Sequence, residues 1–135
     1  MPPEDRLGIL PLGSETVLLV EDVPSVRGVE AHLLSEQGYK VLEAANGVDA
    51  LRVASDLGEE EIHLLVADVF MPLMGGRELA QELIKIHPEV KVLHVSGYTS
   101  SFIGRHGISA SPVDILPKPF TPDVFIRKVR EVLDD

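Results

Sequence analysis

Short apolar runs that are rich in β-branched residues alternate along this chain with longer stretches of helical periodicity. The runs expected to form strands are residues 16–20, 40–43, 62–67, 91–95 and 113–116, and the expected helices are residues 24–37, 47–56, 77–87, 99–106 and 122–133. Strict alternation favours parallel strands, because a chain that re-enters a sheet in the same direction needs a crossover, and right-handed crossovers cover the sheet with helices. The sequence therefore predicts an α/β fold with a doubly wound, five-stranded parallel sheet.

The length of 135 residues is typical of one domain, and a hydrophobic content of 44% is enough to fill one core. Residues 1–13 contain three prolines and two glycines and show no periodicity. We expect residues 1–13 to be a linker or a remnant of cloning, and residues 14–135 to form the domain.

Charge and cysteine content exclude several classes of function. Twelve Lys and Arg residues against 22 Asp and Glu residues give a net charge of −10, which would repel nucleic acid and anionic lipid. The chain has no cysteine, so disulfides, thiolate zinc sites and cysteine nucleophiles are excluded. No basic segment followed by a long apolar run precedes the domain, and we expect a cytoplasmic protein that does not bind membranes by itself.

Polar side chains follow four of the five expected strands. Glu21 and Asp22 come after the first strand, Asp68 after the third, Ser96 after the fourth and Lys118 after the fifth. Because ligands of such sheets bind at the carboxyl ends of the strands, we expect these side chains to converge. Three carboxylates suit Mg²⁺, and an ammonium and a hydroxyl suit a phosphoryl group. Asp68, central in the sheet, is the candidate nucleophile that would form an aspartyl phosphate.

Four segments at these strand ends carry a resemblance to a known family. They are residues 17–22 (VLLVED), 67–72 (ADVFMP) with Gly76 after it, 95–97 (VSG) and 118–120 (KPF). In this order the chain resembles the response regulator receiver domains of two-component signalling over essentially its whole domain. The resemblance implies a flavodoxin-like (βα)5 fold with strand order 2-1-3-4-5.

The resemblance also implies a role for each acidic residue. Asp68 would accept a phosphoryl group from a kinase histidine. Asp22, Asp68 and the backbone carbonyl of Phe70 would contact Mg²⁺ directly, and Glu21 would reach the ion through water. The protein would then be a phosphoacceptor signalling domain, with self-catalysed phosphoryl transfer and slow autodephosphorylation, rather than an enzyme with an external product.

The residues at the last two strands would act on the phosphoryl group. By resemblance, Lys118 would pair with phosphoryl oxygens, Ser96 would move to hydrogen-bond them, and the bond from Lys118 to Pro119 would be cis. Many receivers place an aromatic residue three positions before the lysine as a switch, whereas this chain has Ile115 there. A β-branched residue cannot swing a ring, so we expect output to depend on backbone shifts of residues 96–101.

Two aromatic residues are expected to lengthen the lifetime of the phosphorylated state. Phe70 lies two positions after Asp68, and Tyr98 lies two positions after Ser96. In the family these positions line the path of the hydrolytic water. Bulky aromatic groups beside an acyl phosphate exclude or misplace that water, so we expect slow loss of the phosphoryl group.

Each site residue also has a purely structural interpretation. Glu21 and Asp22 would cap the first helix, Asp68 would begin a turn and Lys118 would be a solvated charge. Their joint position at one sheet edge favours the phosphoryl site. A Mg²⁺ phosphohydrolase usually has a second carboxylate two positions after its nucleophile, and Phe70 stands there instead. A receiver-like interaction module that is never phosphorylated is the remaining alternative.

The resemblance implies a sensor histidine kinase or a histidine phosphotransfer domain as the phosphodonor. Because the chain ends at Asp135, directly after the last expected helix, we expect output through docking to a downstream protein that the sequence does not identify. A weak homodimer through the last two helices is one arrangement. The segments 13–17 and 118–133 resemble receivers at the C-terminus of hybrid sensor kinases, and a single-domain regulator is the alternative.

Overall fold

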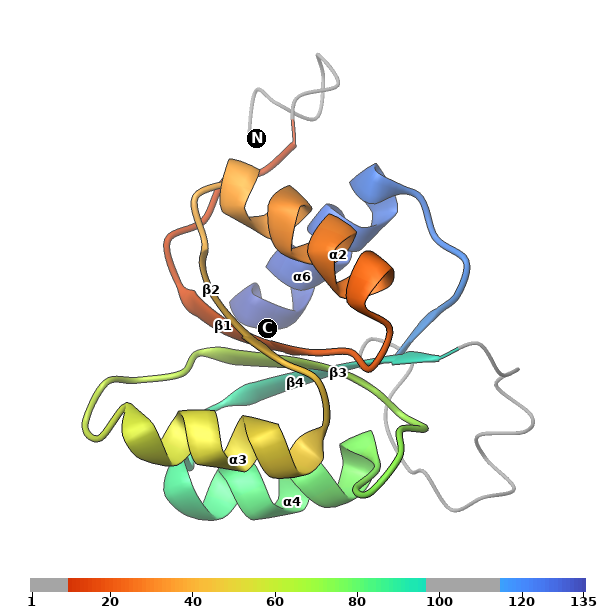
Figure 1. Ribbon diagram of the computed structural model, residues 1–135. Helices are drawn as coiled ribbons and strands as arrows, with labels where there is room; N and C mark the ends of the chain where they lie inside the picture. The colour runs from red at the N-terminus through yellow and green to blue at the C-terminus, as the bar shows by residue number, and fades with distance from the viewer. Residues whose placement is uncertain (1–9, 97–114) are drawn as a thin grey trace.

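A five-stranded parallel sheet forms the middle layer of the computed structural model, which describes residues 10–96 and 115–135 (Figure 1). The strands are β1 (Thr16–Val20), β2 (Lys40–Ala44), β3 (Leu64–Asp68), β4 (Lys91–Ser96) and β5 (Ile115–Pro117). Their order across the sheet is β2-β1-β3-β4-β5, and each neighbouring pair is parallel. The predicted fold class and strand order are therefore confirmed.

Helices cover both faces of the sheet. Helices α2 (Pro24–Glu36) and α6 (Pro122–Asp134) lie on one face, and α3 (Gly47–Asp56) and α4 (Gly76–Ile86) lie on the other (Figure 1). Among the described residues no helix is long and apolar enough to span a bilayer. The helix expected at residues 99–106 and the start of the strand expected at residues 113–116 lie outside the described residues.

The strands are apolar on both sides because both faces of the sheet are covered. In β1, Val17 and Leu19 join the core beneath α2 and α6, whereas Leu18 and Val20 join the core beneath α3 and α4. On α6, Phe125, Val129 and Val132 are buried in the same core as Val17, and Phe125 is completely inaccessible to solvent. Side-chain alternation along each strand thus divides the core into two layers.

Several element boundaries differ from the prediction by one or two residues, and the cap of α2 differs as well. Strand β3 begins at Leu64 rather than residue 62, because its ladder with β1 starts where Leu64 pairs with Val17. Helix α4 begins at Gly76, one residue earlier than expected, and ends at Ile86. The N-cap of α2 is Val23 and not Asp22, and Val23 makes no side-chain cap.

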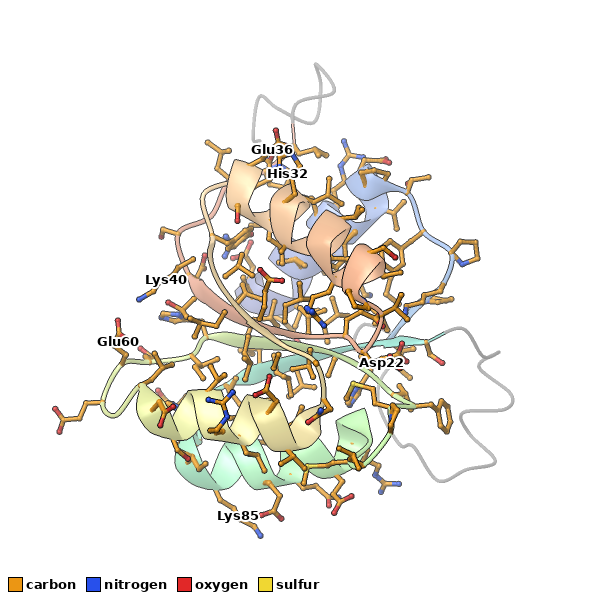
Figure 2. All side chains as sticks on the ribbon, in the orientation of Figure 1. Asp22, His32, Glu36, Lys40, Glu60 and Lys85 are labelled. Atoms are coloured by element: carbon orange, nitrogen blue, oxygen red, sulfur yellow. The ribbon has the colours of Figure 1, made fainter. Side chains whose placement is uncertain are left out.

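The register of the sheet brings the carboxyl ends of four strands to one edge. Val20 pairs with Ala67 in β3, Asp68 pairs with Val95, and Ser96 pairs with Pro117. Figure 2 shows Asp22 at this end of the sheet. The exposed ion pair between Lys40 and Glu60, with 2.9 Å between Nζ and Oε1, lies at the opposite end (Figure 2). The acidic residues that follow β1 and end β3 therefore meet at the edge predicted for the site.

Candidate functional site

Three carboxylates meet at the carboxyl ends of β1 and β3. Glu21 and Asp22 follow β1 directly and Asp68 is the last residue of β3, and one carboxylate oxygen of each lies within 4.8 Å of the others. Glu21 is buried, with 1% of its surface exposed, whereas Asp22 is exposed. The side chain of Asp68 lies between these extremes, at 14% exposure. The predicted convergence of the three acidic residues is confirmed.

Lys118 supplies the positive charge of the site. Its Nζ donates to Oε1 of Glu21 and to Oδ2 of Asp68, each at 2.8 Å. Burial alone would lower the pKa of Lys118, but the hydrogen bonds to Asp68 and Glu21 outweigh burial and hold that pKa above its ordinary value. The ammonium therefore stays charged and links the buried carboxylate of Glu21, which follows β1, to the carboxylate of Asp68 at the end of β3.

Backbone contacts fix the positions of these side chains. The backbone N–H of Phe70 donates to Oδ1 of Asp68 at 3.3 Å, and that of Val23 donates to Oε2 of Glu21 at 3.1 Å. The backbone N–H of Lys118 donates to the carbonyl oxygen of Ser96 at 2.6 Å. The peptide bond from Lys118 to the following proline is cis, as the resemblance implied.

Gly76 allows α4 to start directly against the backbone of β3. A Cβ atom at this position would lie 2.3 Å from the carbonyl oxygen of Asp68, too close for any side chain. The Gly76 N–H donates to the carbonyl oxygen of Val69 at 3.0 Å, which closes the turn between the strand and the helix. We therefore interpret Gly76 as a residue that allows close packing against the backbone of Asp68, and not as part of a phosphate-binding loop.

The remaining predicted residues lie at several depths around this cluster. Ser96 ends β4 and is completely buried, and Phe70 is half-buried in the turn after β3. Ile115 starts β5, opposite His94 in the ladder, and is half-buried. Tyr98 lies outside the described residues. The roles assigned to these four residues in phosphoryl handling and switching stay predictions.

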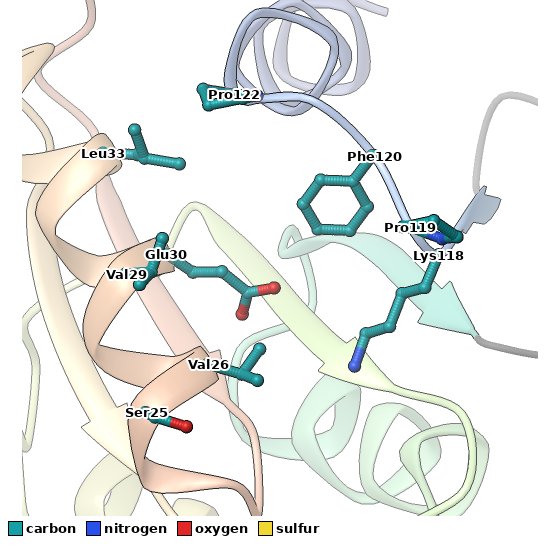
Figure 3. A pocket seen from close by; sticks show the side chains of 9 residues that line it. All are labelled: Ser25, Val26, Val29, Glu30, Leu33, Lys118, Pro119, Phe120 and Pro122. Atoms are coloured by element: carbon teal, nitrogen blue, oxygen red, sulfur yellow. The ribbon is translucent and has the colours of Figure 1, made fainter.

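Glu30 is a residue of this neighbourhood that the sequence interpretation missed. It lies on α2 with 3% of its surface exposed, and it lines a groove that Lys118 also lines (Figure 3). Burial and the charge of Glu21 raise the pKa of Glu30 to about 7, while Lys118 opposes the rise. A sequence signal existed: Glu30 precedes the buried Leu34 by four positions and so shares its helix face.

The chemistry of the donor set fits a hard divalent cation. Carboxylate oxygens are the ligands that Mg²⁺ prefers, and Glu21, Asp22 and Asp68 offer one each within a short span. Three anionic groups with one ammonium among them leave a net negative charge that such an ion would offset. The same cluster would hold a phosphoryl group between the cation and Lys118.

A model of one protein family matches most of this chain. The model is described as the response regulator receiver domain, and it matches residues 17–130. The matched range includes every residue of the acidic cluster and Lys118.

Individual relatives agree with this match. The chain is 43% identical to the sensor kinase CckA of Brucella abortus over 90% of its own length and 13% of the kinase. It is 29% identical to the response regulator receiver protein CpdR of the same organism, over 87% of its own length and 95% of CpdR. Among solved structures, the receiver domain from the hybrid histidine kinase CckA has a TM-score of 0.72 and 35% identity, covering 87% of this chain and 98% of that domain.

Proposed function

Because this chain belongs to the response regulator receiver family, we propose that Asp68 is its phosphoacceptor in a two-component phosphorelay. Receiver domains are signalling modules rather than classical enzymes. The observation that carries the assignment is the surroundings of the Asp68 carboxylate at the end of the central strand. Nζ of Lys118 lies 2.8 Å from Oδ2 of Asp68, and carboxylate oxygens of Glu21 and Asp22 lie within 4.8 Å.

Asp68 acts as the nucleophile. A carboxylate oxygen of Asp68 attacks the phosphorus of a phosphohistidine presented by the partner, and the P–O bond forms as the P–N bond breaks. The electron pair of the P–N bond stays on the imidazole nitrogen, which takes up a proton. The contact from the Phe70 N–H holds Asp68 in a fixed direction for this attack.

Lys118 and Ser96 receive the phosphoryl oxygens. The Lys118 ammonium already touches Asp68, so it lies next to the charge that the phosphoryl group brings. Glu21 holds Lys118 from the buried side of the site, which keeps the ammonium oriented before the partner arrives. Ser96, at the neighbouring strand end, would donate its hydroxyl to a phosphoryl oxygen.

Three residues are suited to hold Mg²⁺. Asp22, Asp68 and the carbonyl of Phe70 would contact the ion, and Glu21 would reach it through water. When bound, the ion offsets negative charge on the phosphoryl oxygens and the carboxylates. The mutual distances within the carboxylate cluster support this assignment.

We infer that the phosphodonor is a histidine of a sensor kinase or of a phosphotransfer domain. The match to a sensor kinase over 13% of that protein's length supports a hybrid kinase as the source of such a domain. The match to CpdR covers 95% of that protein, which supports a single-domain regulator as the alternative, but its sequence identity to this chain is lower. The higher identity to the kinase favours the first arrangement.

Intact mass after incubation with acetyl phosphate and Mg²⁺ tests the phosphoacceptor assignment, with the Asp68→Asn variant as control. We expect one labile phosphoryl adduct on the parent protein and none on the variant. The same adduct on both proteins would contradict the assignment. Absence of an adduct on the parent with acetyl phosphate and also with phosphoramidate would contradict it as well, and would favour the interaction module.

A further inference from the structure

A groove runs between α2 and the segment that leads into α6, on the face of the molecule next to Lys118 (Figure 3). Its volume is about 530 Å³, within the range typical of sites that hold a whole small molecule. The walls are mainly apolar and include the side chains of Val26, Val29, Leu33, Phe120 and Pro122. Phe120 is braced from behind by Phe125, with 5.2 Å between the ring centroids.

Glu30 is the buried acidic group of this groove. Its carboxylate projects from α2 toward the groove and the opposite wall (Figure 3). Only 3% of the residue is exposed, and neither carboxylate oxygen has a hydrogen-bond partner within the described part of the chain. A buried carboxylate without a partner is costly, so a ligand that pairs with it would recover that free energy.

The charges around the groove favour a cationic ligand. The charged groups that act on Glu30 are Glu21, Asp68 and Lys118. The ammonium of Lys118 is bonded to the other two, and its charge opposes but does not cancel their effect on Glu30. A metal ion is a poor fit because hard divalent cations need six or more oxygen ligands, whereas these walls are aliphatic and aromatic.

We propose that this groove binds a small organic cation, an ammonium or guanidinium carried on an apolar body. The charged group pairs with the carboxylate of Glu30. The apolar body packs on Val26, Leu33 and the ring of Phe120, which also attracts a nearby cation. The groove lies beside the phosphoacceptor carboxylate and shares Lys118 with it, but its acidic group is Glu30.

The pH dependence of binding follows from the same geometry. Glu30 faces the negative charges of Glu21 and Asp68 and the positive charge of Lys118, and its pKa is raised to about 7. A cation pairs with the ionised form, so its binding lowers that pKa and releases a proton in solutions below this value. We therefore expect affinity to be about tenfold higher at pH 8 than at pH 6.

Titration with 2-phenylethylammonium, followed through backbone amide NMR shifts, tests the proposal. The uncharged control ligand is 2-phenylethanol, which has the same body. On the parent protein the ammonium should bind at least tenfold more tightly than the alcohol and should shift the amides of Val29, Leu33 and Phe120. In Glu30→Gln this preference should vanish, whereas Glu36→Gln, an exposed change on the same helix, should retain it.

A second variant distinguishes loss of the site from a folding defect. Val26→Lys places an ammonium one helical turn before Glu30, where it should pair with the Glu30 carboxylate. The affinity for 2-phenylethylammonium should then fall at least tenfold, while the amide spectrum remains that of a folded protein. Equal affinity for the ammonium and the alcohol, or unchanged ammonium binding in Glu30→Gln or Val26→Lys, would overturn the proposal. Shifts confined to the amides of Asp22 and Asp68 would also overturn it, because the probe would then occupy the acidic cluster.

Discussion

Individual side chains at the carboxyl edge of the sheet control one another's charge. Lys118 contacts both Glu21 and Asp68, and those contacts keep the ammonium charged despite its partial burial. Glu30 lies nearby on α2, and none of the described residues forms a hydrogen bond to its carboxylate. Lys118 is thus paired with Glu21 and Asp68, whereas the carboxylate of Glu30, which lines the groove, has no such partner within residues 10–96 and 115–135.

Glu30 should make the stability of the protein fall as pH rises. The pKa of Glu30 is about 7 in the folded protein against an ordinary 4.5, so the folded state binds this proton more tightly than the unfolded state. The free energy of unfolding therefore decreases as pH rises from 4.5 to 7, and the deficit is complete above pH 7. Glu30→Met should remove a deficit of up to about 3 kcal/mol, as measured by urea unfolding at pH 5 and pH 8.

Glu36→Met is the matched control for this experiment. Glu36 is on the same helix, with 59% of its side chain exposed. Its replacement should change the free energy of unfolding by a similar small amount at both pH values. A parent and a Glu30→Met variant with the same difference in stability between pH 5 and pH 8 would contradict the burial argument.

Phe70 should slow the loss of the phosphoryl group. It is half-buried two positions after Asp68, where an aromatic ring excludes or misplaces the hydrolytic water. Phe70→Asn should shorten the phosphoryl half-life severalfold, because an amide can orient water. The decay of the phosphorylated mass over time measures this rate.

Phe70→Leu keeps an apolar side chain at the same position and separates polarity from a general disturbance. It should lose the phosphoryl group more slowly than Phe70→Asn. If Phe70→Asn decays no faster than the parent protein, Phe70 does not set the lifetime.

Among the helices and strands, α4 starts directly against the backbone at the end of β3. Gly76→Ala would put a Cβ atom 2.3 Å from the carbonyl oxygen of Asp68, and a backbone atom cannot yield without moving the strand end. We expect a loss of about 2 kcal/mol or more in the free energy of unfolding and a slower phosphorylation of Asp68. Urea unfolding and the rate of adduct formation measure the two effects.

Gly28→Ala is the matched control for Gly76→Ala, because an added Cβ atom at Gly28 has free space. Gly28 lies inside α2, and a Cβ atom there would meet nothing within 4 Å. Alanine should therefore stabilise the protein by up to about 1 kcal/mol, since it has the higher helix propensity. Equal effects of the two substitutions would show that close approach to Asp68 is not what requires Gly76.

Elements whose ends carry a local signal could be predicted from sequence. The bounds of β1 and α3 are correct, and the N-cap Asn46 of α3 accepts a hydrogen bond from the Asp49 N–H at 2.8 Å. The start of β3 is wrong by two residues because apolar residue Ile62 is buried without joining the ladder. Pairing with β1, which local periodicity does not encode, decides where that strand begins.

Some residues of the candidate site could likewise be predicted from sequence, and others could not. Glu21, Asp22, Asp68 and Lys118 could be predicted because strand order brings the ends of neighbouring parallel strands together. Glu30 could not be identified as a groove residue by the same logic. Helical periodicity places Glu30 on the same face as the buried Leu34, but the groove beside it depends on how α2 packs near α6 and the segment around Phe120, which is a property of the tertiary structure.

In the whole molecule, helices cover both faces of the sheet, and the candidate site lies at the carboxyl ends of the strands with the groove next to it. The cluster of Glu21, Asp22 and Asp68 is at the carboxyl ends of β1 and β3, and the groove opens beside it between α2 and the segment that leads into α6 (Figure 3). Lys118 belongs to both places. With a net charge of −10, the chain is suited to partners that present positive charge.

Chemical trapping of the acyl phosphate identifies the residue that accepts the phosphoryl group. The protein is incubated with acetyl phosphate and Mg²⁺, reduced with borohydride, digested, and mapped by mass spectrometry. Reduction of an aspartyl phosphate gives homoserine, and we expect homoserine at position 68 alone, absent when acetyl phosphate is omitted. Homoserine at another aspartate, or an intact Asp68 in protein that carries the phosphoryl mass, would rule out Asp68 as the phosphoacceptor.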